Sequence, residues 1–171
     1  MPSPAKRPVV PHPLNPSLAL VQLTRGYWAV IDAAYSAEVA RSNWSATVVS
    51  KTVYASTNFP EKISLHRFIA RLSGMDISGL IDHRNCNGLD CRSSNLRPAT
   101  KATNAQNRGL DRSNASGVKG VHFENYTGKW RAEVWAHGKH LRLGRFATLE
   151  EAAVVASAAR TEHHGEFARL Q

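Results

Sequence analysis

The sequence predicts an α+β protein built from small antiparallel β-sheets and short helices in separate modules. Residues 117–171 alternate apolar and polar side chains over three short segments and then change to helical spacing. Residues 63–108 contain a short amphipathic helix, a polar loop-rich segment and a second short helix in succession. No segment approaches the roughly eighteen apolar residues that span a membrane, and the N-terminus lacks a signal peptide's apolar core.

The charge balance indicates a polyanionic partner. The chain of 171 residues carries 22 Lys and Arg against 13 Asp and Glu, a net charge of +9. Such an excess favours nucleic acid as the partner, with a basic structural protein such as a ribosomal one as the alternative. Two cysteines are too few for a disulfide scaffold, so we expect a reducing cytoplasm.

Residues 1–17 hold six of the eight prolines and predict an extended tail, because proline fits neither a helix interior nor an inner strand. Residues 18–62 predict a small β-rich subdomain. Within it we expect a strand at 27–31, helical structure between 32 and 43, and two short strands at 46–50 and 52–56.

A helix is predicted from residue 65 to about 72, with Ser64 as its N-cap. Leu65, Phe68, Ile69 and Leu72 form its apolar stripe. Arg67 lies off that stripe, where it fits either a DNA phosphate contact or ordinary surface charge.

The most unusual residues follow the apolar residues 80–81, which predict a strand delivering Asp82 and His83 at its end. Asn87-Gly88 predicts a tight turn, Pro98 the end of a second strand, and Thr100 the start of a helix. On that helix one face carries Lys101, Asn104 and Arg108. An acid, an imidazole and carboxamides this close together suit a hard divalent metal and a general base.

These elements together resemble the HNH nuclease family, in the branch of phage and intron-encoded homing endonucleases. The resemblance implies a ββα-metal fold over residues 63–108. It rests on five spaced elements: Leu65-His66-Arg67, Asp82-His83, Asn87-Gly88-Leu89-Asp90, Ser94-Asn95-Leu96-Arg97 and Asn104-Ala105-Gln106-Asn107.

The resemblance also implies roles. Asp82 and Asn104 would hold one Mg²⁺ or Mn²⁺, and His83 would take the proton of the attacking water. Asn95 would hold the loop that orients His83, although a plain turn residue is the other interpretation. The expected products have 5′-phosphate and 3′-hydroxyl ends. Further DNA contacts are predicted for Arg67, Arg97, Lys101, Arg108 and Arg112.

Cys86 and Cys91 are separated by four residues, and the sequence has no second cysteine pair. Because a closed structural zinc site usually has four ligands, we expect no structural zinc and interpret both as loop-packing residues.

Residues 109–116 predict a linker, and residues 117–171 a second module. We expect strands at 118–124, 129–136 and 139–144, followed by a helix with a capping box formed by Thr148 and Glu151. One sheet face should carry the apolar side chains Val121, Phe123, Trp130, Ala132, Val134, Leu141 and Leu143 and pack on that single helix.

This module resembles the Apetala-two or ethylene-response-factor DNA-binding domain. The matching residues are Gly120-Val121, Gly128-Lys129-Trp130, Ala132-Glu133-Val134, Leu143-Gly144-Arg145-Phe146, residues 148–153, Gly165 and Phe167-Ala168. In that family the sheet lies in the major groove. The positions expected to contact DNA are Lys119, His122, Lys129, Arg131, Glu133, Trp135, His140, Arg142 and Arg145. The departures from the family's arginine-rich face leave the base preference open, and Trp135 also fits a partner or domain contact.

The sequence therefore predicts a site-specific, metal-dependent endonuclease of the homing type that binds double-stranded DNA. One active site per chain favours a monomer that nicks one strand, in the cytoplasm of a bacterial or phage-infected cell. The alternative is a non-catalytic DNA-binding protein whose HNH module has decayed.

Overall fold

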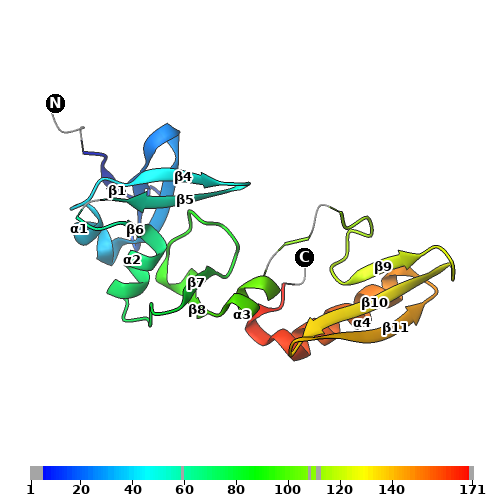
Figure 1. Ribbon diagram of the computed structural model, residues 1–171. Coiled ribbons are helices and arrows are strands. Elements are labelled where there is room, and N and C mark those ends of the chain that lie inside the picture. Colours follow the sequence, from blue (N-terminus) through cyan, green and yellow to red (C-terminus); the bar gives the residue numbers. More distant parts are fainter. Residues whose placement is uncertain (1–5, 59, 108, 111–112, 170–171) are drawn as a thin grey trace. The chain divides into compact units, whose positions relative to one another are not determined.

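The computed structural model describes residues 6–58, 60–107, 109–110 and 113–169, and the chain divides into two compact units, Met1–Thr100 and Lys101–Gln171 (Figure 1). Each unit combines antiparallel β-structure with helices, which confirms the predicted mixture of α and β structure.

The first sheet has the order β1-β2-β3, formed by Val9–Pro11, Leu18–Gln22 and Trp28–Asp32. Strand β3 lies one residue beyond the predicted 27–31. The prediction of an extended tail over 1–17 is wrong for β1, which pairs with β2 at the sheet edge. Proline is tolerated there because it has no backbone N–H, and the outer side of an edge strand needs no N–H for pairing.

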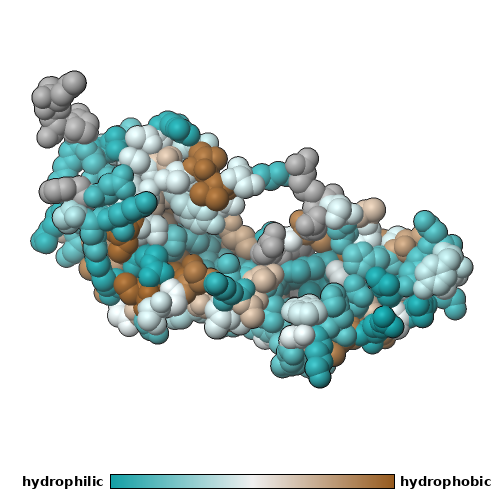
Figure 2. Space-filling view, in the orientation of Figure 1, coloured by the Kyte–Doolittle hydropathy of each residue, from teal (hydrophilic) through white to brown (hydrophobic). Residues whose placement is uncertain are grey.

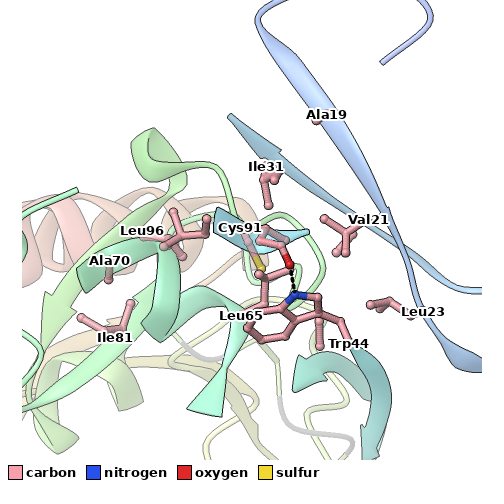
Figure 3. Close-up of a cluster of buried hydrophobic side chains, with 14 residues drawn as sticks. Ala19, Val21, Leu23, Ile31, Trp44, Leu65, Ala70, Ile81, Cys91 and Leu96 are labelled. Atoms are coloured by element: carbon pink, nitrogen blue, oxygen red, sulfur yellow. Dashed lines mark hydrogen bonds between the residues drawn. The ribbon is translucent and has the colours of Figure 1, made fainter. Parts of the chain in front are cut away.

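Helical structure after β3 is shorter than the predicted 32–43. It consists of the 3₁₀ turn η2, Ala33–Tyr35, and α1, Ser36–Val39, while a further 3₁₀ turn, η1, covers Thr24–Gly26. Trp44 follows α1 and is buried in the core. Its indole N–H donates a 2.9 Å hydrogen bond to the carbonyl of Val39 (Figure 3).

A second sheet contains β4, Ser45–Val49, β5, Thr52–Thr57, and β6, Ile63–Ser64, in sequence order. The first two form the predicted hairpin, and Ser50 turns the chain with a φ of 57°.

Helix α2 covers Leu65–Leu72, as predicted, and buries Leu65 and Ile69 completely. Ser64 occupies the N-cap position, but its side chain makes no capping hydrogen bond. Its hydroxyl instead lies 3.2 Å from Nε2 of His66.

Strands β7, Leu80–His83, and β8, Leu96–Ala99, form a two-stranded sheet, with the 3₁₀ turn η3, Ser93–Asn95, directly before β8. Pro98 lies inside β8, opposite Ile81, and does not end the strand as predicted. A two-stranded sheet tolerates this because one side of each strand needs no partner.

One hydrophobic core joins these elements. Figure 3 shows Val21 and Ile31, from the first sheet, near Leu65 and Leu96, from α2 and β8. Residues on both sides of the expected boundary between 62 and 63 contribute to this core, so the subdomain at 18–62 packs directly on the segment that follows it. The division into two compact units falls between Thr100 and Lys101, inside the predicted 63–108 nuclease segment.

The second unit contains a sheet of order β11-β10-β9 with α4 packed against one face (Figure 1). Small side chains at the contact, Ala132 on the sheet with Ala152 and Ala156 on the helix, are fully buried and allow close approach. The elements are α3, Lys101–Gln106, β9, Val121–Glu124, β10, Lys129–Ala136, β11, Lys139–Phe146, α4, Leu149–His164, and the 3₁₀ turn η4, Gly165–Phe167.

The capping box at the start of α4 is confirmed: Thr148 accepts from the Glu151 backbone N–H, and Glu151 accepts from that of Thr148. Phe123 pairs with Trp130 and lies on the predicted face of the sheet, but its side chain is 49% exposed and packs edge-on against Trp130. In the four-residue strand β9 the buried positions are Val121, on the face that packs on α4, and Glu124, which lies on the other face and is covered by Arg131 and Arg145.

The surface seen in Figure 2 is mostly hydrophilic, with apolar side chains scattered in small groups. Within the described part of the chain, no helix has both the length and the apolar character needed to cross a membrane.

Candidate functional site

Asp82 and His83 are the last two residues of β7, where the register places them opposite Arg97 and Leu96 of β8. Both side chains are buried, with 7% and 5% of their surface exposed. The Arg97 guanidinium donates through Nε and Nη2 to Oδ2 of Asp82, at 3.0 and 2.8 Å. The buried carboxylate is therefore paired with a buried guanidinium.

This pairing corrects the role expected for Arg97. Only 3% of its surface is exposed, so its guanidinium faces Asp82 in the interior and not a surface that DNA could reach. The physical reason is the hairpin register, which sets a cation directly across from the buried acid.

Asn95 holds the loop between β7 and β8. Its side-chain amide donates to Oδ1 of Asn85 and to the carbonyl of Asp90, while its Oδ1 accepts from the Asn85 backbone N–H at 3.1 Å. Its own carbonyl accepts from the backbone N–H of Arg84, directly after His83. These bonds connect both sides of the loop to the residue that follows the candidate base.

Asp90 is a second anchor of this loop, for which the sequence assigned no individual role. Its carboxylate accepts from Asn85 and twice from Arg92, at 2.7 and 2.6 Å. Burial alone would raise the pKa of Asp90, but the hydrogen bonds and charge of Arg92 outweigh it and hold that pKa below its usual range. The chain around Asp90 also bonds to Val30 of β3 through Leu89 and Cys91.

Two rings, those of His66 and Tyr54, lie beside His83, the candidate base. The ring centroid of His66 lies 4.8 Å from that of His83, and Tyr54 lies 5.8 and 5.9 Å from the two imidazoles. Burial, with the charges of His83 and Arg67, lowers the pKa of His66 to about 3. Burial also lowers the pKa of His83, against the opposing effect of Asp82 and Asp90. Both imidazoles are therefore neutral near pH 7.

Tyr54 was not found by sequence reasoning, since a tyrosine in a hairpin strand fits ordinary β-propensity. The sequence feature that could have pointed to Tyr54 is Gly88, because a glycine can mark a close approach between two backbone segments. A Cβ atom there would lie 2.5 Å from the Val53 carbonyl oxygen and 2.8 Å from the Tyr54 ring. Only glycine allows the loop to approach β5 this closely.

Cys91 is fully buried in the core, where burial raises the pKa of its thiol. Cys86 is half-buried, and no disulfide bond joins it to Cys91. In the residues that the structure describes, no three His, Cys, Asp or Glu side chains gather as they would around a metal ion.

Arg67, expected at a phosphate, donates to two backbone carbonyls before β7, those of Gly79 and Ile77, at 2.7 and 2.5 Å. Lys101 and Asn104 lie exposed on α3, in the second unit. The meeting of Asn104 with Asp82 at a metal stays a prediction. Arg108 and Arg112 lie outside the described residues.

The sheet face of the second unit carries the predicted alternation of charged and aromatic side chains, but its charges pair with one another. Buried Glu124 accepts from Arg131 at 3.1 Å and from Arg145 at 2.5 Å. The hydrogen bond from Arg145 is the main cause that lowers the pKa of Glu124. Glu133 lies 3.4 Å from Arg131 and 3.7 Å from His122. Two expected DNA-binding arginines are thus held by acids of the same face.

The other expected contacts on this unit differ in their surroundings. Trp135 is 53% exposed and meets the His140 ring edge-on at 4.6 Å. Arg142 and Lys129 are exposed, and neither forms an ion pair within the described part of the chain. Lys119 is half-buried and donates to the carbonyl of Gln106 at the end of α3.

Comparison with known proteins gives two relatives. Protein 3.8 of Escherichia phage T7 is 36% identical over 91 residues, which cover 53% of this chain and 74% of the phage protein. This chain belongs to the protein 3.8 family. That family assignment rests on a match over most of the phage protein's length.

This member of the protein 3.8 family is also 36% identical, over 110 residues, to a protein of Acanthamoeba polyphaga mimivirus named as an uncharacterized HNH endonuclease. The match covers 63% of this chain and 56% of the mimivirus protein, so the chain spans little more than half of that relative. No family model and no solved structure matches the chain.

Proposed function

We propose that this chain is a metal-dependent DNA endonuclease of the HNH type. The observation that carries the proposal is the position of Asp82 and His83 at the end of β7, beside a loop held by Asn95. The similarity to a mimivirus protein named as an HNH endonuclease supports it, and the net charge of +9 suits a polyanionic substrate.

His83 acts as the general base in this proposal. A phosphodiester is hydrolysed when water attacks phosphorus and loses a proton to a nearby acceptor. Because burial lowers the pKa of His83, its imidazole is neutral near pH 7 and can accept that proton. His66 and Tyr54 pack against the His83 ring and limit its rotation, while Asn95 fixes the loop that follows it.

Asp82 and Asn104 are the proposed metal ligands. One carboxylate and one carboxamide offer two hard oxygen ligands. This small number fits Mg²⁺ or Mn²⁺, because such ions usually keep several waters and bind substrate phosphate. When bound, the ion supplies positive charge to the phosphate and to the leaving oxygen. Arg97 fixes the orientation of the Asp82 carboxylate through two hydrogen bonds to one oxygen.

The second unit is proposed as the DNA-reading module, of the Apetala-two type. Its three-stranded sheet presents Arg142, Trp135 and His140 on an exposed face, and arginine in the major groove can bind guanine bidentately. With one Asp-His pair per chain, we propose a monomer that nicks one strand at a preferred site, as a homing-type enzyme would.

The test is a supercoiled plasmid incubated with the full chain, with and without Mg²⁺ or Mn²⁺. We expect metal-dependent nicking that is lost in His83→Ala, while binding to duplex DNA is retained because the base acts on water. His12→Ala, outside the ring cluster, is the matched control. DNA binding without metal-dependent nicking by the parent chain would favour the non-catalytic alternative.

A further inference from the structure

A pocket of about 560 Å³ lies within the second unit, at the end of β10. Strand β9 pairs with β10 only as far as Ala132, so the edge of β10 beyond that residue is not covered by β9. Residues from three directions line the pocket: Ala105 and Gln106 from α3, Val134 and Trp135 from β10, and Arg160 and His164 from α4. Its volume lies in the usual range for small-molecule sites.

Two of the lining residues are buried and incompletely bonded. Arg160 is 2% exposed, and its guanidinium donates to the carbonyl of Lys119. Its Nε has no hydrogen-bond partner, and within the described residues Arg160 forms no ion pair. A buried cation without a carboxylate is costly unless an anion approaches it.

His164 lies beside it, 8% exposed. Its Nε2 donates to the carbonyl of Trp135 at 2.9 Å, and its Nδ1 has no partner. Glu133 is the one carboxylate among the lining residues, and Arg131 and His122 already lie within ion-pair distance of it. The lining therefore keeps an excess of positive charge available to a bound group.

An aromatic side chain accompanies this charge. Trp135 lines the pocket and is 53% exposed, and His140, also in the lining, meets its ring edge-on. Buried positive charge beside an exposed indole matches the chemistry of a nucleotide, whose phosphate is anionic and whose base has a flat apolar face.

We propose that this pocket binds a single nucleotide of a DNA strand, with its phosphate beside Arg160 and its base against Trp135. The inference rests on the proposed function in so far as DNA is the ligand. It adds a site for one unpaired nucleotide to the sheet face expected to read duplex DNA. A free nucleotide carries the same chemistry, so the experiment includes both sources.

The experiment uses the full chain and measures binding calorimetrically to deoxyadenosine 5′-monophosphate, deoxyadenosine and a single-stranded deoxyadenosine oligomer. A labelled duplex is followed by fluorescence anisotropy. The variants are Trp135→Ala and Arg160→Gln, and Trp28→Ala is the control because that tryptophan is also exposed but lies in the first unit. Circular dichroism checks folding. If Arg160→Gln unfolds, Trp135→Ala still tests the pocket, because Trp135 is exposed and its removal should not disturb the core.

We expect the monophosphate and the oligomer to bind, and deoxyadenosine to bind more weakly because it lacks the phosphate. Each pocket variant should weaken binding by about tenfold. Variants that bind the monophosphate and oligomer as tightly as the parent chain would overturn the proposal. So would displacement of the monophosphate by polyglutamate at equal charge, which would indicate an acidic peptide.

The two proposals can fail separately. If the duplex binds and is nicked but neither the monophosphate nor the oligomer binds, the pocket inference is wrong and the proposed function stands. If the oligomer binds through the pocket and no nicking occurs, the pocket stands and the nuclease proposal fails. If no form of DNA binds, both are wrong.

Discussion

Arg97 and Asp82 lie opposite each other on β8 and β7, and two N–H groups of the arginine share one oxygen of the acid, at 3.0 and 2.8 Å. Both side chains are more than nine-tenths buried. The residue that sequence reasoning assigned to a metal is therefore oriented by a residue that it assigned to DNA.

Arg97→Gln should destabilise the first unit strongly, because the buried Asp82 carboxylate would lose its cation. Removing one member of a buried pair typically costs about 3–5 kcal/mol. Urea unfolding of the full chain measures the loss. Arg71→Gln is the control, since the ion pair of Arg71 with Glu61 is exposed and such pairs contribute about 1 kcal/mol or less. Equal losses in the two variants would contradict a stabilising role for the buried pair.

Gly88→Ala should also destabilise this unit. The added Cβ would collide with the Val53 carbonyl and the Tyr54 ring, and overpacking of this kind costs about 1–3 kcal/mol. At Gly79 the nearest atom to a Cβ is 3.4 Å away, so Gly79→Ala is the matched control and should cost less. Thermal melts compare them, and a harmless Gly88→Ala would show that the loop does not need this approach to β5.

The stability of the first unit should fall in acid partly through His66. Its pKa is about 3 in the folded chain, below the usual value of 6.5, so the unfolded chain binds the proton more readily. The contribution is therefore complete above pH 6.5 and is lost as the pH falls from 6.5 towards 3, by at most about 5 kcal/mol. In His66→Phe, the free energy of unfolding should depend less on pH across this range than in His12→Phe. Identical pH dependence in both variants would contradict the lowered pKa of His66.

Arg142→Ala should relax sequence preference, whereas Lys129→Ala should lower affinity equally for all sequences. Arg142 is exposed on the sheet face, and a bidentate arginine–guanine contact gives about 1–3 kcal/mol of discrimination. Lys129 begins β10 beside a turn, a position suited to phosphate. Binding to the preferred site and to random DNA at several salt concentrations separates the two effects. If Arg142→Ala weakens both DNAs by the same factor, Arg142 is only a phosphate contact.

Local pattern was sufficient for several elements. The stripe of Leu65, Phe68 and Ile69 fixed the bounds of α2, and Thr148 with Glu151 fixed the start of α4. Both depend on residues three or four positions apart, whose contacts are made within one helix and need no information from the rest of the chain.

The sequence by itself also determined which residues are candidates for chemistry, because Asp82, His83 and Asn95 are recognisable from type and spacing. Only the tertiary structure decided their partners. Arg97 is turned inward by the register of a hairpin whose strands are separated by a twelve-residue loop, residues 84–95. Tyr54 reaches His83 because one core joins β5 to β7. Contacts between distant segments depend on how whole elements pack, and no local periodicity encodes that packing.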